Sequence, residues 1–307
     1  MIRALAVLPV LGGLAVLAAL SGTAAADDAL VALVPGKPGA RHHATPLAIG
    51  PHGEVYAPDA AGHWIRTEPV STATAITGAV RGDDAVYAGG DGTVYRLADN
   101  GWTAVRVVQH GAAILARGAG GHPIAAVDKQ LLSLDTLAAG EPVKLAVAAE
   151  PITAAAFGAA GPVIATAAGL AQLRGKRFTP IRAPHGAVLV SDRWAVAHDG
   201  AIALATGTVT PWPDGFELEI AAAIPGGGLV VVGMRADGPP PRTRVIAELR
   251  GRRWKLVPLA ADDAAARHPV GVTIDAAGRF VVAFANGDVV SGGAKTETHG
   301  HIAEAAR

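Results

Sequence analysis

Residues 84–105 read DAVYAGGDGTVYRLADNGWTAV, and this stretch decides the fold. A first apolar run leads into the turn sequence Gly90-Asp91-Gly92, and a second run ends at Leu97. After a short polar turn, a third run starts around Trp102. The Asp-Gly pair supplies the positive φ angles that a tight hairpin needs. The stretch therefore predicts three consecutive antiparallel strands.

The same pattern recurs along the chain at a fixed interval. Three leucine–aromatic pairs share a separation of five residues: Leu97 with Trp102, Leu173 with Phe178, and Leu249 with Trp254. Trp64 precedes Trp102 by 38 residues, and the later aromatic residues follow at twice that distance. Steps of 38 residues give seven positions, of which two are irregular, and we expect Val143 and Trp212 to occupy them. Units of about 40 residues, each with four strands, are typical of β-propellers.

The sequence thus predicts an all-β fold, a seven-bladed β-propeller of four-stranded antiparallel blades. Six or eight blades are the alternatives within this fold. A β-sandwich also has frequent turns, but it does not require a period of 38 residues. Abundant turn residues (39 glycines and 21 prolines) agree with many short strands.

The repeat resembles those of bacterial exported propellers of the WD40, YVTN and kelch-like superfamily. Gly89-Gly90, Tyr95 and Trp102 are closest to the kelch pattern, and the resemblance covers residues 44–295. It implies the fold and no particular activity. In such propellers one end of the chain often completes the blade that the other end begins. The resemblance therefore implies that the apolar segment 29–34 completes the last blade.

The N-terminus predicts export. Arg3 is followed by the apolar run 4–20 and by the small residues Ala24 and Ala26, a layout typical of a cleaved signal peptide. The alternative is a retained membrane anchor, since the run is close to spanning length. Cleavage after residue 26 predicts a periplasmic or extracellular location. The chain then has four parts: the signal peptide 1–26, an N-terminal segment 27–43, the propeller 44–295 and a tail 296–307.

The composition excludes several classes of function. The chain has no cysteine, which rules out disulfides, lipoprotein acylation and any thiolate nucleophile or ligand. Its 26 basic and 26 acidic residues balance, so no global charge favours nucleic acid. After the signal peptide, no apolar segment is long enough to span a membrane. The composition does not indicate an oligomeric state.

Six polar residues stand ahead of apolar runs that we assign to innermost strands. In a propeller these strands line the central channel, so their starts should converge on one face. The six candidates for ligands at the channel mouth are His43, His110, Glu150, His185, Glu219 and His268. Imidazoles and carboxylates together are the ligands of zinc, manganese or non-haem iron. The alternative is a merely polar channel mouth without a metal.

Two functions remain open at this point. The first is a non-catalytic binding or scaffold module for a protein or a saccharide, which needs no cofactor. The second is a metal-dependent lyase, hydrolase or oxygenase in which His43, His110, His185 and His268 bind the metal. No complete catalytic motif is visible, and Ser191-Asp192 and Asp199-Gly200 are typical of turns. The sequence therefore favours the binding module.

Overall fold

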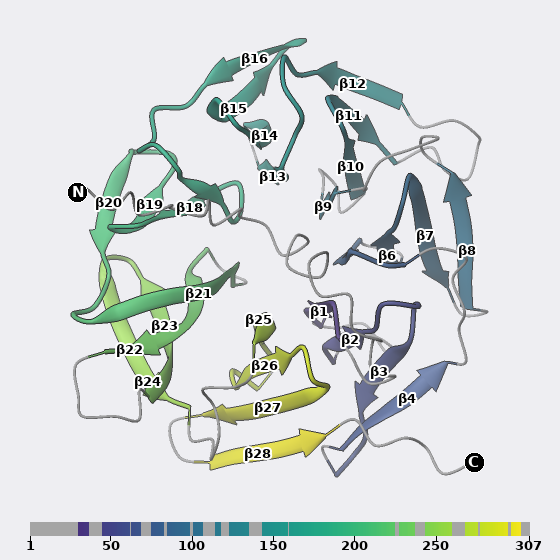
Figure 1. The fold of residues 1–307 in the computed structure, drawn as a ribbon, viewed down its shortest axis with the longest axis vertical. Helices are drawn as coiled ribbons and strands as arrows, with labels where there is room; N and C mark the ends of the chain where they lie inside the picture. Colours follow the sequence, from purple (N-terminus) through teal and green to yellow (C-terminus); the bar gives the residue numbers. More distant parts are fainter. Residues whose placement is uncertain are drawn as a thin grey trace, which may run out of the picture.

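A computed structural model describes most of the chain. The described residues are 30–36, 45–61, 63–68, 75–82, 85–98, 101–106, 114–117, 123–134, 143–158, 160–224, 227–236, 243–259, 268–275, 277–293 and 296–301. Their strands form seven four-stranded antiparallel sheets arranged as blades around a central axis (Figure 1), which confirms the predicted propeller and its blade number. No helix among these residues is both long and apolar enough to cross a membrane.

The first four blades follow one another along the chain, and each runs in order from the innermost to the outermost strand. Blade 1 contains β1 (Ala32–Val34), β2 (Leu47–Ile49), β3 (Val55–Pro58) and β4 (Trp64–Glu68). Blade 2 contains β5 (Gly78–Arg81), β6 (Val86–Gly89), β7 (Thr93–Ala98) and β8 (Gly101–Arg106). Blade 3 contains β9 (Ile114–Arg117), β10 (Pro123–Val127), β11 (Gln130–Ser133) and β12 (Val143–Val147). Blade 4 contains β13 (Ala154–Gly158), β14 (Gly161–Thr166), β15 (Gly169–Arg174) and β16 (Arg177–Pro180).

The last three blades repeat the same order. Blade 5 contains β17 (Val188–Leu189), β18 (Trp194–Ala197), β19 (Gly200–Ala203) and β20 (Thr208–Pro211). Blade 6 contains β21 (Phe216–Ala223), β22 (Leu229–Arg235), β23 (Thr243–Arg250) and β24 (Arg253–Pro258). Blade 7 contains β25 (Pro269–Ile274), β26 (Phe280–Phe284), β27 (Asp288–Gly293) and β28 (Thr296–His301).

Apolar residues on both faces of each sheet form the core between neighbouring blades. Between blades 6 and 7, for example, Val230, Val232, Val282 and Phe284 are all fully buried in one cluster. Continuous runs such as 229–232 suit strands that are covered on both faces. Packing of sheet against sheet around the ring therefore supplies the stability that disulfides would otherwise add.

The leucine–aromatic pairs occupy the same register in three blades. Leu97 pairs with Trp102, Leu173 with Phe178 and Leu249 with Trp254, always between the third and fourth strands. Trp64 also lies on a fourth strand, and it is buried against Val281 and Ala283 of the preceding blade. The predicted equivalence of these four aromatic residues is confirmed, because each packs toward the blade before it.

The two irregular positions differ from the prediction. Trp212 follows β20 and packs forward on Phe216 and Trp254 of blade 6, with ring centroids 5.6 and 5.3 Å apart. Val209, which pairs with Ile202, holds the aromatic register in blade 5 instead. Val143 begins β12 and is 50 % exposed. The period alone could not place these residues, because the turns before them differ in length from those of the other blades.

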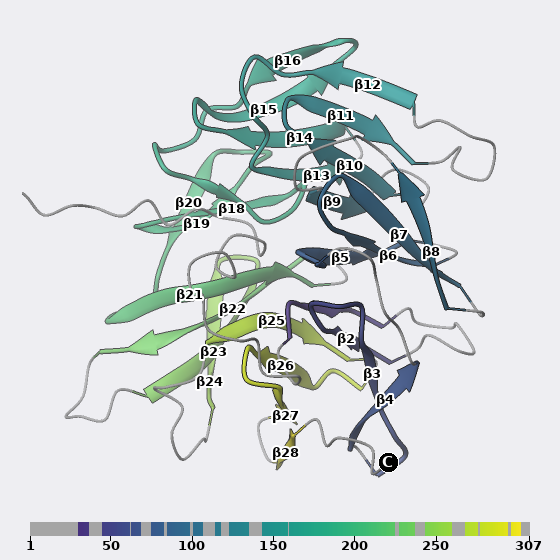
Figure 2. The same ribbon diagram turned by 45° about the vertical axis from the view of Figure 1, so that its right-hand side comes forward.

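The ring closes differently from the expectation. Segment 29–34 was expected to complete the last blade, but β1 pairs with β2 in blade 1, and β28, drawn from the predicted tail, completes blade 7. Figure 1 shows β1 and β2 beside β25 and β26, and β1 contacts both strands of blade 7, so the first and the last blade are neighbours in the ring. Figure 2 shows blade 7 beside blade 1 from a second side. Among the described residues, no blade takes strands from both ends of the chain. Closure therefore rests on packing between the faces of blades 7 and 1 and on a 3.4 Å hydrogen bond that the backbone N–H of Leu30 donates to the carbonyl oxygen of Ala285.

Candidate functional site

The seven innermost strands give the ring two distinct ends. Each innermost strand runs in the same direction along the axis, because every blade repeats the same antiparallel order. We call the end where these strands begin the entry end, which also holds the turns between second and third strands. We call the end where they finish the exit end, which holds the turns between first and second strands.

Three of the six predicted ligands lie at the entry end. Glu150, His185 and His268 come shortly before β13, β17 and β25 respectively. Both histidines are exposed, whereas a Glu150 Oε2 atom accepts a 2.8 Å hydrogen bond from the backbone N–H of Ala168 in the β14–β15 turn. The Glu150 carboxylate thus stabilises a turn of its own blade.

His43 and His110 lie outside the described residues. In the sequence His43 precedes β2, which is the second strand of its blade, whereas the prediction required an innermost strand. Within the described part of the chain, no three His, Cys, Asp or Glu side chains gather into a metal-binding group. The predicted metal site therefore stays a hypothesis that depends on the two histidines not described.

Glu219 has a structural partner. It lies inside β21 at a bulge between Leu218 and Ile220, whereas the sequence suggested a position ahead of the strand. Its two carboxylate oxygens accept hydrogen bonds of 2.7 Å from Nε and Nη2 of Arg244 on β23. The Arg244 guanidinium also lies 5.6 Å from the ring centroid of Phe284 in blade 7. Glu219 therefore neutralises a buried arginine at the contact of two blades.

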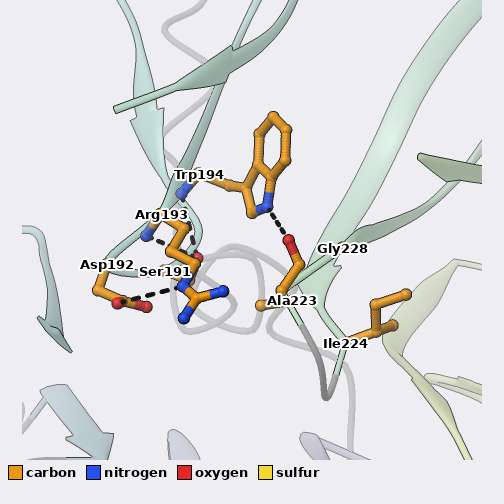
Figure 3. Close-up of a pocket in the computed structure, with 8 residues that line it drawn as sticks. Ser191, Asp192, Arg193, Trp194, Ala223, Ile224 and Gly228 are labelled. Carbon is orange, nitrogen blue, oxygen red and sulfur yellow. Dashed lines mark hydrogen bonds and ion pairs between the residues drawn. The ribbon is translucent and has the colours of Figure 1, made fainter. Parts of the chain in front are cut away.

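A hollow lies at the exit end, between blades 5 and 6 (Figure 3). It has a volume of about 370 Å³. One wall is the β17–β18 turn and the other is the β21–β22 turn. The residues that line it are Ser191, Asp192, Arg193, Trp194, Ala223, Ile224, Gly227 and Gly228.

Hydrogen bonds hold both walls in place. The Ser191 Oγ atom accepts hydrogen bonds from the backbone N–H groups of Arg193 (3.2 Å) and Trp194 (3.1 Å), which fixes the first turn. The indole Nε1 of Trp194 donates to the carbonyl oxygen of Gly227 at 2.9 Å and joins the first turn to the second. Because Trp194 is only 8 % exposed, this bond is shielded from water. The hollow is therefore preformed.

Glycines make room for the charged side chains at its rim. A Cβ atom on Gly227 would lie 2.2 Å from Nη1 of Arg193, and the φ of Gly227 is +95°. A Cβ atom on Gly158, in blade 4, would lie 2.5 Å from the Asp192 carboxylate. Asp192 and Arg193 form an ion pair of 3.9 Å, and Arg193 is 65 % exposed in its side chain. Both charges are thus presented to solvent beside the opening.

The groups at the opening can bind polar groups of a ligand. The Ser191 hydroxyl oxygen accepts two backbone hydrogen bonds and so holds its own turn. At the rim the Arg193 guanidinium can donate hydrogen bonds and the Asp192 carboxylate can accept them. Sequence reasoning placed Ser191-Asp192 correctly in a turn but missed the hollow, because its other wall comes from the next blade.

Comparison with known proteins reveals similarity of structure. No protein-family model matches the chain, and no curated protein matches it. U3-55K superposes with a TM-score of 0.59 at 11% identity, over 85% of this chain and 89% of that chain. YCF48 from Cyanidioschyzon merolae superposes with a TM-score of 0.58 at 11% identity, over 86% of this chain and 95% of that chain. A chain of the mitotic checkpoint complex superposes with a TM-score of 0.56 at 10% identity, over 89% of this chain and 89% of that chain. The fold that the chain shares with these structures is the β-propeller.

Proposed function

We propose that this chain is a non-catalytic binding module that holds a segment of a protein partner at the exit end of its ring. The observation that carries the proposal is the preformed hollow between blades 5 and 6, whose walls are joined by the Trp194–Gly227 hydrogen bond. A rigid site loses little conformational entropy on binding, and this favours affinity.

The lining of the hollow supports a polypeptide ligand. The surface that lines it is more polar than apolar, and Asp192 and Arg193 present a carboxylate and a guanidinium beside its opening. A polypeptide offers matching groups, since each peptide unit carries a hydrogen-bond donor and an acceptor. The tryptophans are used within the fold, since Trp102, Trp194, Trp212 and Trp254 each donate the indole N–H to a backbone carbonyl. The exposed aromatic platform that would favour a saccharide is therefore not part of this hollow.

The place of action in this proposal is outside the cytoplasm. The charged start, the apolar run and the small residues at 24 and 26 support removal of residues 1–26 on export. A chain without cysteine forms no disulfides under the oxidising conditions found there. The metal-dependent alternative is tested separately, by elemental analysis of the purified protein for stoichiometric zinc, manganese or iron.

Site-directed photo-cross-linking in the native host tests the proposal. A benzophenone amino acid replaces Arg193 at the exit end or, as a matched control, Asp199 in the β18–β19 turn of the same blade at the entry end. Both positions are exposed. We expect one protein to be cross-linked reproducibly from position 193 and not from position 199. Cross-linking from position 199 alone, or from neither position, would contradict binding at the exit end.

A further inference from the structure

A second feature of the exit end is a buried arginine. Arg81 is the last residue of β5, the innermost strand of blade 2, and only 7 % of it is exposed. On β5 the side chain of Ala79 packs toward blade 1 and that of Val80 toward blade 3. Since side chains alternate along a strand, Arg81 points toward blade 1. It therefore lies between two innermost strands at the edge of the channel.

The guanidinium of Arg81 is only partly satisfied. Its Nε donates a 2.5 Å hydrogen bond to the carbonyl oxygen of Pro35, which follows β1. Its Nη2 is buried and has no hydrogen-bond partner within the part of the chain that the structure describes. A buried donor without an acceptor is costly, and more so when it carries a charge.

Arg244, which is also buried, has the kind of partner that Arg81 needs. Arg244 is 2 % exposed, and a carboxylate binds both its Nε and its Nη2. Arg81 has a neutral carbonyl at Nε, and none of the described residues accepts a hydrogen bond from its Nη2. Burial lowers the pKa of Arg81 to about 10, so that the guanidinium is still protonated at neutral pH. In the described part of the interface of blades 1 and 2, this cation thus has no anion at Nη2.

We propose that Arg81 binds a carboxylate of the protein partner through Nη2 at the exit end of the ring. This inference rests on the proposed function and names the chemistry of the bound segment. A single vacant donor suits one oxygen of a singly charged carboxylate, whereas a phosphate would require several donors. The hydrogen bond between charged groups satisfies the buried donor and neutralises the cation in one step.

Two sources can supply the carboxylate, namely an acidic side chain or the C-terminus of a polypeptide. Three short peptides distinguish them: acetyl-trialanine with a free C-terminus, acetyl-Ala-Asp-Ala amide, and acetyl-trialanine amide as the uncharged control. Binding is measured by titrating each peptide into the mature protein and following the ¹⁵N signals of the arginine side chains. The three peptides have the same backbone length and differ in the carboxylate and its position.

At least one acidic peptide should bind roughly 10-fold to 100-fold more tightly than the amide control, as expected for a hydrogen bond between charged groups. The Arg81 signals should shift on titration. The Arg81→Met variant should lose the preference. The control Arg279→Met should keep it, because Arg279 lies at the same end but is exposed and paired with Asp275 at 2.7 Å.

Equal binding of acidic and neutral peptides by the unmodified protein would overturn the inference, whether or not the variants fold. A preference that survives in Arg81→Met would also overturn it. These results are distinguishable from failure of the proposed function. A cross-link at position 193 without a carboxylate preference leaves the binding module standing and removes the role of Arg81. A carboxylate preference without that cross-link keeps the role of Arg81 and removes the hollow as the place where the partner binds.

Discussion

At the scale of single residues, the two buried arginines show how charge is managed in this core. Arg244 on β23 and Glu219 on β21 form an ion pair within blade 6, and the ring of Phe284 in blade 7 packs on the Arg244 guanidinium. The two partners differ in exposure, since 2 % of the Arg244 side chain is accessible against 22 % for Glu219. Replacing Glu219 and replacing Arg244 should therefore lower the free energy of unfolding by different amounts.

We expect Glu219→Ala to lower the free energy of unfolding by about 3–5 kcal/mol, because it removes the carboxylate that binds both Nε and Nη2 of a buried cation. Arg244→Met should cost less, since methionine fills similar space and the remaining carboxylate can reach water. Chemical denaturation of both variants measures the difference. Equal costs, or a larger cost for Arg244→Met, would contradict this explanation of the pair.

The sequence could not reveal the role of Glu219. Its partner lies 25 residues away on β23, and a bulge shifts the register of β21 at this point. In the sequence Glu219 therefore looked like a residue ahead of an apolar strand that begins at Ile220, whereas β21 begins at Phe216. The hollow was hidden for a similar reason, since Ser191–Trp194 and Gly227–Gly228 meet only when neighbouring blades pack. The glycine run at 226–228 is the one local signal that pointed to it.

At the scale of strands and blades, the sequence was most informative where structure is local. The Gly90–Gly92 turn and the five-residue Leu–aromatic step are set by hairpin geometry, so the strands of blades 2, 4 and 6 could be predicted. The assignment of β1 could not, because its partner β2 follows the segment 35–46 and not a tight turn. A terminal strand joins one blade or another according to how the blades pack, and the repeat pattern in the sequence does not predict this packing.

The aromatic residues of the outer strands should contribute according to their burial. Trp64 is 3 % exposed and packs on blade 7, so Trp64→Ala should cost about 3–5 kcal/mol of unfolding free energy. Trp102 is only half-buried on blade 1, and Trp102→Ala should cost less. Thermal and chemical unfolding of the two variants in parallel would test this ranking. The reverse order would show that the closing contact between blades 7 and 1 is weak.

Closure of the ring depends on a close approach between Gly271 and β1. A Cβ atom on Gly271 would lie 2.4 Å from Cβ and 3.0 Å from the backbone nitrogen of Leu33. Gly271→Ala should therefore destabilise the fold by about 1–3 kcal/mol through overpacking. Gly78→Ala is the matched control, because Gly78 also lies on an innermost strand but has no atom within 4 Å of the added methyl group. Similar unfolding midpoints for both variants would argue against this mode of closure.

At the scale of the whole molecule, the ring separates two ends with different chemistry. The entry end carries the exposed His185 and His268, and the exit end carries the hollow and the buried Arg81. The proposed function assigns binding to the exit end. It also requires that the ring reach the compartment in which the partner is found.

Export predicts a shortened chain in the native host. Intact-mass measurement of the protein purified from that host should give a chain that begins at or within a few residues of Asp27, because the small residues at 24 and 26 match the preference of signal peptidase. Recovery of the full-length chain from the membrane fraction would instead support the retained anchor.

Binding at the exit end is the central claim, and hydrogen exchange tests it most directly. The cross-linked partner is added to the mature propeller, and exchange of backbone amides is followed turn by turn. Protection is predicted in the turns at 190–193 and 224–228, while the turns at 184–187 and 198–199 at the entry end exchange as before. Protection confined to the entry end, or spread along the outermost strands, would contradict the claim.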